Sequence, residues 1–247
     1  MRFLACVAVA GACTTAAPLS SSSGPGEAPS GPAGEGAIVV ELFTSQGCSS
    51  CPPADRLLTA IAAAEVGAGT ARRPVIALAF HVDYWNNLGW RDPFSSSSAT
   101  ARQETYVQAL GRGLYTPQLV VNGRAHVVGS RRGDVERAIA NATPVPALAA
   151  TAALEDGIVR VRATPPAGTH AMVAVFENEL ATEVRAGENR GEQLRNDRVV
   201  RALEPVGAGG AQVSIDPSWR RDHLGVVVLA QRDDGSIAAA REVSLSP

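Results

Sequence analysis

Residues 37–61 read A-I-V-V-E-L-F-T-S-Q-G-C-S-S-C-P-P-A-D-R-L-L-T-A-I, and this stretch decides the fold. Its first seven residues are almost continuously apolar, which is typical of a strand buried on both faces of a sheet. Apolar residues then recur at helical spacing from Ala54 to Ile61, and Pro52 and Pro53 are tolerated only in a first helical turn. The stretch therefore predicts a strand, a turn that carries two cysteines, and a helix.

The 247-residue chain is close to neutral, with a formal net charge of −2. Its basic residues are all arginines, and they form no block and do not alternate with aromatic residues. Nucleic acid is therefore not an expected partner. The length suits a leader, one domain and a second, smaller domain.

An export signal is predicted over residues 1–12, where one arginine precedes an apolar run shorter than the roughly 20 residues of a membrane span. The small residues before Cys13 resemble a bacterial lipoprotein signal, in which Cys13 would be lipidated and would anchor the protein to a membrane. Ordinary secretion, to the periplasm or beyond, and a cytosolic apolar N-terminus are the alternatives. Residues 13–36, almost wholly Ala, Ser, Gly and Pro, predict a disordered linker.

A second buried strand, parallel to the first, is predicted over residues 74–82. A helix is expected over about 100–110, with Thr100 and Gln103 as its capping box. Asn122-Gly123 lies between two apolar runs and predicts a tight antiparallel hairpin, which a helix over roughly 133–142 follows.

The element order over residues 37–145 is then β-α-β-α-β-β-α, the order of the thioredoxin fold. Residues 146–247 instead carry short alternating strands separated by turns. These strands begin near Ile158, Met172, Val199, Gln212 and Gly225. The expected fold class is α/β, with a thioredoxin-like domain followed by a small antiparallel β-sandwich-like domain.

Cys48 and Cys51 are the one cysteine pair outside the leader, which holds Cys6 and Cys13. A C-x-x-C pair at a helix start places its first sulfur near the positive end of the helix dipole. Cys48 is therefore expected to be the attacking thiolate, and Cys51 the thiol that resolves the mixed disulfide. The same spacing also occurs in half of a zinc site and in plain structural disulfides.

The loop after the second strand gathers four of the chain's aromatic residues, Tyr84, Trp85, Trp90 and Phe94. We interpret this loop as a wall around the cysteines or a docking surface, with Trp85 as a substrate-binding candidate; a small core that stabilises the loop is the alternative. His81 and Asp83 lie beside it. His81 and two thiolates would form a site for copper or another soft metal, whereas a hydrogen-bonded core histidine is the alternative.

Four separated motifs resemble a single bacterial family. They are E-L-F-T-S-Q-G-C-S-S-C-P-P-A-D, F-H-V-D-Y-W-N-N-L-G-W-R-D-P-F, Y-T-P-Q-L-V-V-N-G, and G-E-N-R-G (residues 187–191) followed by V-V-R-A-L. The family consists of secreted thioredoxin-like proteins known only as a domain of unknown function. The resemblance implies a thioredoxin-like domain with an appended β domain, and it supplies no established activity.

Resemblance to thioredoxins also implies roles for three residues. Thr116 and Pro117 become substrate-binding candidates, because a cis proline at this point faces the C-x-x-C. Glu41 becomes the buried acid that carries a proton for the resolving thiol. An ordinary strand-entry proline and a glutamate that only hydrogen-bonds at the sheet edge are the alternatives.

Together these features predict an exported thiol–disulfide oxidoreductase of the cell envelope. It would act through a redox-active disulfide, with no other cofactor, on protein or small-molecule thiols. Two other functions stay open: binding or delivery of a copper-type metal by the same cysteines, and non-enzymatic binding by a secreted protein with a structural disulfide.

Overall fold

The computed structural model describes Met1, residues 36–63 and residues 74–245. The predicted export signal, the lipidation site Cys13 and nearly all of the linker lie outside the described residues. From residue 36 onward the described residues belong to one compact unit. None of the helices in these ranges is long and apolar enough to span a membrane.

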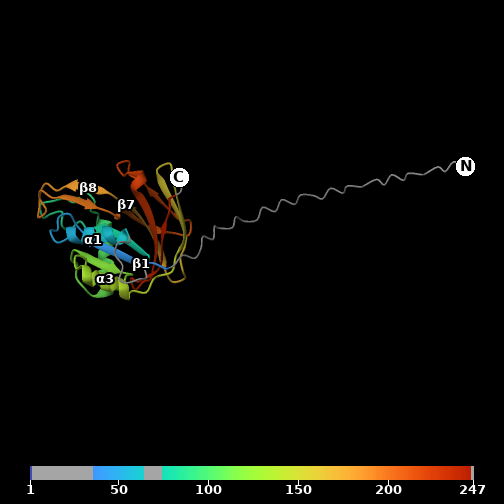
Figure 1. The fold of residues 1–247 in the computed structure, drawn as a ribbon, viewed down its shortest axis with the longest axis horizontal. Coiled ribbons are helices and arrows are strands. Elements are labelled where there is room, and N and C mark those ends of the chain that lie inside the picture. Colours follow the sequence, from blue (N-terminus) through green and yellow to red (C-terminus); the bar gives the residue numbers. More distant parts are fainter. Residues whose placement is uncertain (2–35, 64–73, 246–247) are drawn as a thin grey trace. The chain divides into compact units, whose positions relative to one another are not determined.

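One mixed sheet of eight strands dominates this unit, in the order β13-β12-β7-β10-β2-β1-β3-β4. Figure 1 labels β1 and β7 of this sheet. Its strands are β1 (Ile38–Thr44), β2 (Val75–His81), β3 (Gln118–Val121), β4 (Ala125–Val128), β7 (His170–Glu177), β10 (Val199–Val206), β12 (Leu224–Gln231) and β13 (Ile237–Val243). A three-stranded antiparallel sheet has the order β11-β6-β5, and two short strands form the hairpin β8-β9. These strands are β5 (Ala149–Glu155), β6 (Ile158–Thr164), β8 (Leu180–Glu183), β9 (Gln193–Asn196) and β11 (Ala211–Ser214). The helices of the described part are α1 (Pro52–Ala62), α2 (Ser97–Leu110), α3 (Arg132–Asn141) and the short 3-10 turn η1 (Arg221–His223).

Helices and the smaller sheet cover the two faces of the large sheet. α1 and α3 pack on the face to which Ile38, Val40 and Leu42 point. α2 packs on the opposite face, against Val39 and Phe43. The three-stranded sheet packs on β7, β12 and β13, so that the C-terminal half has two stacked sheets. The architecture is a strand-dominated mixed α/β fold.

The local predictions from the central stretch are confirmed. Strand β1, a turn and helix α1 follow one another, and β1 pairs in parallel with β2. The hairpin at Asn122-Gly123 is also present, with both residues at positive φ (50° and 65°) as a tight two-residue turn requires.

The predicted capping box of α2 is wrong. The helix begins at Ser97, and the hydroxyl of Ser96 caps it by accepting the Ala99 N–H at 3.1 Å. The Thr100 hydroxyl instead donates to the Asp83 carboxylate at 2.6 Å, across to the end of β2. A serine preceding the helix thus served as the cap, one turn earlier than the S/T-x-x-E/Q pattern suggested.

The structure differs from the expected succession of two separate domains. β10 pairs in parallel with β2 at Val199 and Ala79, and the Ala79 N–H donates to the Arg198 carbonyl at 2.8 Å. Residues 37–145 and 146–247 therefore share one sheet. Without β10 this edge of β2 would present unpaired backbone groups, a liability that sheets normally cover.

The tip of the β3–β4 hairpin sets a strict requirement for glycine. A Cβ on Gly123 would lie 2.1 Å from the carbonyl oxygen of Gly235, and the residue has a positive φ. We expect Gly123→Ala to lower the free energy of unfolding by about 2–4 kcal/mol, from overpacking and backbone strain together. Gly113→Ala is the matched control, because a Cβ there meets nothing within 4 Å. Equal urea midpoints for the two variants would contradict this expectation.

Candidate functional site

Cys48 and Cys51 form a disulfide in the turn between β1 and α1, with their Cα atoms 5.4 Å apart. The Cys48 N–H donates to the Ser45 carbonyl, and the Cys51 N–H to the Cys48 carbonyl, each at 3.1 Å. Cys51 is the N-cap residue of α1, and its carbonyl accepts the first bonds of the helix. This geometry places the disulfide at the positive end of the helix dipole.

Pro52 and Pro53 shape the electrostatics of this helix start. Because they lack N–H groups, they remove two of the donors that a helix N-terminus would otherwise offer to a thiolate. Ser50 supplies a donor instead, since its Oγ lies 3.3 Å from the Sγ of Cys48. A thiolate at Cys48 would therefore be stabilised by the Ser50 hydroxyl and by the dipole.

The structure brings Trp85, Thr116 and the turn before Cys48 together. A Cβ on Gly47 would lie 3.2 Å from the Trp85 Cβ, and the indole N–H of Trp85 donates to the Thr116 hydroxyl at 2.9 Å. The Thr116–Pro117 peptide bond is cis. Gly129 lies between Pro117 and the first turn of α1, because a Cβ there would meet both Pro117 and Ala54 within 3.5 Å.

The other residues of the aromatic loop hold polar partners in place. Trp90 donates its indole N–H to the Gln46 side chain at 3.3 Å, and the Tyr84 hydroxyl donates to Gln103 at 3.2 Å. The Phe94 ring packs edge-on against His81. Tyr84 and Trp85 pack against the core on the α2 face of the sheet, and Phe94 packs against the core on the α1 face. The loop thus walls the disulfide turn through Trp85 and joins the two main cores instead of forming a small core of its own.

Glu41 does not lie with the cysteines. It points to the α2 face of the sheet, with Val39 and Phe43, whereas the disulfide lies at the start of α1. There the Glu41 carboxylate accepts bonds from Arg102 Nε at 2.9 Å, from Arg102 Nη2 at 3.1 Å and from the Tyr106 hydroxyl. All three side chains are buried, and burial raises the pKa of Tyr106 well above its usual value. The geometry gives Glu41 a structural ion pair.

Asp55 is the buried acid that shares a face with the cysteines. It lies in the first turn of α1, four residues after Cys51, and residues at this spacing are neighbours on a helix. Its carboxylate accepts the Thr44 hydroxyl at 2.8 Å. Burial raises the pKa of Asp55 to about 6, although nearby His81 opposes the shift. The group therefore exchanges its proton close to neutral pH.

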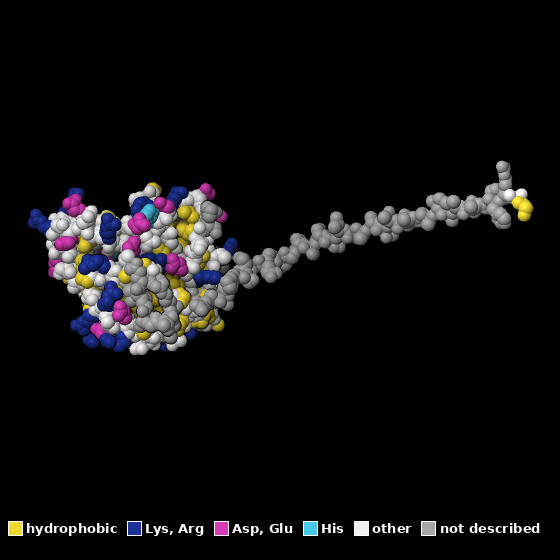
Figure 2. Space-filling view, viewed as in Figure 1, with side chains coloured by type: hydrophobic (Ala, Val, Ile, Leu, Met, Phe, Trp, Pro, Cys, Tyr) yellow, Lys and Arg dark blue, Asp and Glu magenta, His cyan; other side chains and the backbone are white. Residues whose placement is uncertain are grey.

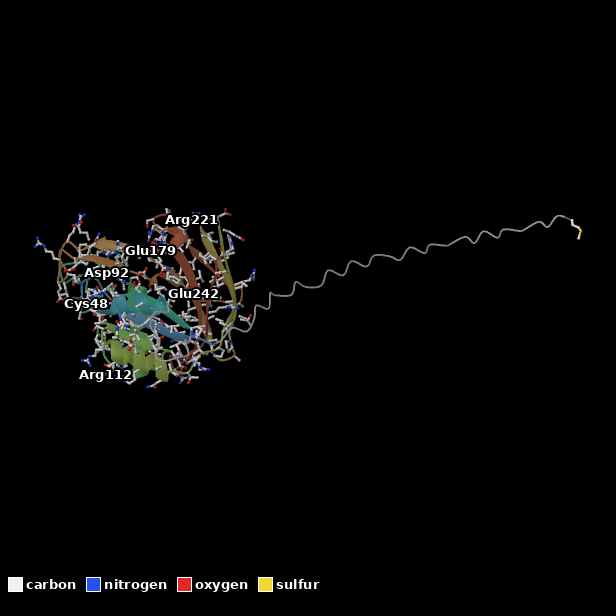
Figure 3. The ribbon with its side chains drawn as sticks, in the orientation of Figure 1. Cys48, Asp92, Arg112, Glu179, Arg221 and Glu242 are labelled. Carbon is white, nitrogen blue, oxygen red and sulfur yellow. A yellow bond between two sulfur atoms is a disulfide. The ribbon has the colours of Figure 1, made fainter. Side chains whose placement is uncertain are left out.

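His81 and Asp92 extend this cluster. His81 Nδ1 lies 2.7 Å from the Asp92 carboxylate, which also accepts the Gln46 N–H at 2.7 Å. Figure 3 shows Cys48 and Asp92 at the same end of the molecule. Burial alone would lower the pKa of His81, but the Asp92 carboxylate outweighs it and the net shift is upward; the pKa of Asp92 falls correspondingly. His81 Nε2 is buried and has no hydrogen-bond partner among the described residues.

The residues of the alternative metal site have other partners in this structure, where Cys48 and Cys51 are joined in the disulfide. Within residues 36–63 and 74–245, no group of three or more His, Cys, Asp or Glu side chains has an arrangement that could hold a metal ion. His81 is paired with Asp92, and Asp83 accepts the Thr100 hydroxyl.

One segment distant in sequence contacts the disulfide turn. Residues 184–192, which connect β8 and β9 and which we call the strap, bond to the disulfide turn. The Asn189 amide donates to the carbonyls of Gln46 and Cys48 at 2.9 and 3.0 Å. The Glu188 carboxylate accepts the Ser49 N–H at 2.9 Å. Sequence reasoning missed these two residues, although both belong to the quoted G-E-N-R-G motif.

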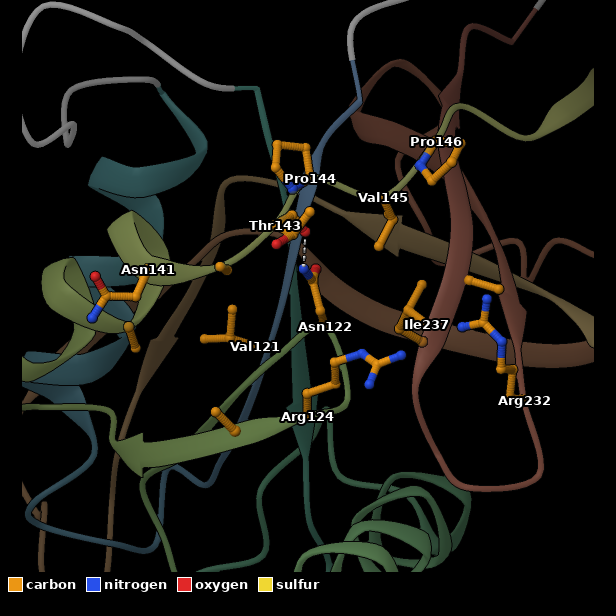
Figure 4. Close-up of a pocket in the computed structure, with 14 residues that line it drawn as sticks. Val121, Asn122, Arg124, Asn141, Thr143, Pro144, Val145, Pro146, Arg232 and Ile237 are labelled. Carbon is orange, nitrogen blue, oxygen red and sulfur yellow. Dashed lines mark hydrogen bonds between the residues drawn. The ribbon is translucent and has the colours of Figure 1, made fainter.

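Cavities occur beside the disulfide and far from it. One of about 450 Å³ lies between α1 and β9, and Pro52, Asp55, Arg56 and Asp197 line part of it. A larger one, of about 690 Å³, has Arg124 and Arg232 among its lining residues, and none of its lining residues belongs to the disulfide turn (Figure 4). The molecular face in Figure 2 shows arginines and acidic residues interspersed. The smaller of these two cavities therefore lies beside the disulfide turn, and it gives the Asp55 carboxyl group a route to solvent.

Fold and site together define a mixed α/β protein with a C-x-x-C disulfide at a helix start. Residues 39–231 match the family described as "Protein of unknown function (DUF1223)", and the chain belongs to this family. No curated protein matches the chain.

Two solved structures are similar. The crystal structure of protein AGR_C_4864 from Agrobacterium tumefaciens has 31% sequence identity and a TM-score of 0.59, and the match covers 83% of this chain and 92% of that one. HBP35 of Porphyromonas gingivalis has 15% identity and a TM-score of 0.56, over 85% of this chain and 76% of that one. The second similarity bears on the fold alone.

Proposed function

We propose that this protein is a thiol–disulfide oxidoreductase with a thioredoxin-like active site. The observation that carries the proposal is the Cys48–Cys51 disulfide at the N-terminus of α1, with an acid of raised pKa one helical turn behind it. Trp85, Thr116 and Pro117 next to this turn support a substrate-binding wall. The sequence signal over residues 1–12 supports action in the cell envelope, on protein or small-molecule thiols.

The proposed reaction begins with the reduced pair. The Cys48 thiolate attacks one sulfur of a substrate disulfide, a Cys48–substrate bond forms, and the other substrate sulfur leaves as a thiolate. The Cys51 thiolate then attacks Cys48, which releases the second substrate thiolate and re-forms the Cys48–Cys51 disulfide. Two electrons pass to the substrate, and a dithiol reductant must restore the pair. The reverse sequence oxidises a dithiol.

In this proposal Asp55, and not Glu41, is the buried acid that accepts the proton of the resolving thiol. Cys51 must lose a proton before it attacks, and an acceptor with a pKa near neutrality suits this step. Asp55 lies one turn from Cys51, and the cavity of about 450 Å³ beside it offers a path to solvent. His81, paired with Asp92, adds positive charge that favours the ionised form of Asp55.

Trapping of the covalent intermediate tests this function. We expect Cys51→Ser to accumulate a mixed disulfide with oxidised insulin chains, because the resolving sulfur is gone, and we expect the wild-type protein to accelerate insulin reduction by dithiothreitol. Cys48→Ser is the matched control and should form no adduct. Absence of both the adduct and the acceleration, in protein whose two thiols have been fully reduced first, would reject the oxidoreductase function.

A further inference from the structure

The disulfide is covered in this structure. Cys48 is 1% exposed and Cys51 is 0% exposed. Disulfide exchange requires a thiolate to approach a sulfur along the line of the S–S bond, so this route must be free of protein atoms. A reagent in solution cannot reach either sulfur in the arrangement observed.

The strap contributes polar contacts to this cover from a segment about 140 residues further along the chain. Its Asn189 is 7% exposed, and the side-chain amide donates hydrogen bonds to the carbonyls of Gln46 and Cys48. Its Glu188 accepts the Ser49 N–H. The strap also lies against the aromatic loop that follows β2. A Cβ on Gly187 of the strap would lie 3.0 Å from the Cβ of Trp90, so the strap backbone closely approaches this loop.

Bonds within the strap keep its own shape. The Gly191 N–H donates to the Val184 carbonyl at 2.8 Å, and the Val184 N–H donates to the Glu192 carbonyl at 2.9 Å. Gly187 and Gly191 both have positive φ, which lets the segment turn tightly. The strap is thus a folded loop whose bonds to the disulfide turn, through Asn189 and Glu188, are separate from the bonds that hold it together.

We propose that the strap is a gate that determines which thiols reach Cys48, with Asn189 and Glu188 as the residues that hold it closed. In this arrangement, free thiols react only in molecules whose strap has moved away. A protein that displaces the strap on docking would gain direct access to the disulfide. The gate rests on the burial and contacts of the oxidised protein, and it deepens the proposed function by giving the β-rich half a part in selecting the substrate.

The rate at which dithiothreitol reduces the oxidised full-length protein tests the gate. One reagent thiolate attacks Sγ of Cys48, the Cys48–Cys51 bond breaks with its electron pair on Cys51, and the second reagent thiol closes the reagent ring and frees Cys48. We expect Asn189→Ala to raise this rate about tenfold, because two hydrogen bonds that favour the closed state are lost. Quenching with an alkylating reagent and mass measurement follows the reaction.

Three further variants make the result specific. Asn189→Asp should raise the rate at least as much, since a carboxylate cannot donate to the two carbonyls. Glu188→Ala should raise it, whereas Glu188→Gln, which keeps an acceptor for the Ser49 N–H, should raise it less. Arg190→Ala is the matched control in the same loop, with an exposed side chain, and should leave the rate unchanged.

Wild-type rates in Asn189→Ala, Asn189→Asp and Glu188→Ala alike would overturn the gate. Thermal unfolding of each variant shows whether a faster rate comes from a folded protein, and the exposed position of Glu188 makes its variants the least disruptive. The outcome is independent of catalysis: a purely structural disulfide would still be reduced faster in the variants, while insulin reduction and adduct trapping would fail.

Discussion

Replacing Arg102 by methionine is expected to lower the free energy of unfolding by about 3–5 kcal/mol, because it leaves the Glu41 carboxylate buried without its cation. The pair lies between β1 and α2, with side-chain exposures of 3% and 1%, so solvent cannot take over the lost interaction. The Tyr106 hydroxyl alone would remain as a donor to Glu41. Urea unfolding at neutral pH gives the measurement.

Two comparisons separate this effect from a general loss of charge. Arg132→Met removes an exposed arginine that lies 3.4 Å from Glu136, and it should change stability by less than about 1 kcal/mol. Adding Glu41→Gln to Arg102→Met should restore part of the loss, since the unpaired charge is then removed. Arg102→Met and Arg132→Met variants of equal stability would contradict the buried ion pair.

Glu41→Gln also bears on the site. Since Glu41 lies on the face of the sheet opposite to α1, this variant should leave the pH dependence of the thiol reactions unchanged. If the thiol reactions of folded Glu41→Gln protein showed a shifted pH dependence, Glu41 would be the proton carrier that the resemblance to thioredoxins implied.

Asp55→Asn is expected to make the protein more stable at pH 7.5 and a poorer catalyst. The pKa of Asp55 is about 6 in the folded protein, against an ordinary 3.8, so the folded state holds an extra proton between these values. Stability therefore falls as pH rises through this window, by at most roughly 3 kcal/mol, because each tenfold change in proton affinity corresponds to about 1.4 kcal/mol. Asparagine does not ionise, so the Asp55→Asn variant does not lose stability over this pH window. Its free energy of unfolding should therefore exceed that of the wild type by a large amount at pH 7.5 and by a small amount at pH 4.

The catalytic part of the prediction is measured on the same variant. Loss of a proton acceptor should slow resolution of the mixed disulfide about 100-fold and remove the change of rate near pH 6. Asp197→Asn is the matched control, because Asp197 lines the same cavity but bonds to Thr59 and to the Glu179 backbone. If the Asp55→Asn protein is more stable but still resolves the mixed disulfide at the wild-type rate, Asp55 has no part in proton transfer.

Local structure was predictable because it depends on neighbours in sequence. The apolar run before Cys48, the prolines after Cys51 and the Asn122-Gly123 turn each specify one element through their own geometry. Strands β5, β8, β9 and β13 were missed. In β8 and β9, four residues with polar partners give too weak an alternation to detect, and β5 and β13 are rich in alanines, which give little apolar contrast.

Long-range features were less accessible. The pairing of β10 with β2 joins residues 120 positions apart, and no periodicity within either strand records its partner. Strand alternation did contain a usable signal: Glu41 has the parity of Val39 and Phe43, whereas the residues that pack on α1 have the other parity. The sequence also contained a signal for Asp55, because it lies four residues after Cys51 and residues at this spacing are neighbours on one face of a helix.

The position of the strap in the chain has a consequence for the order of events at biosynthesis. Cys48 and Cys51 leave the ribosome well before residues 184–192, because synthesis runs from the N-terminus. For that interval the strap cannot cover the sulfurs, and under the proposed gate small oxidants have an access that the finished molecule denies them. Under the proposed gate, the first oxidation of the pair can take place before the strap is present, whereas every later exchange requires the strap to move.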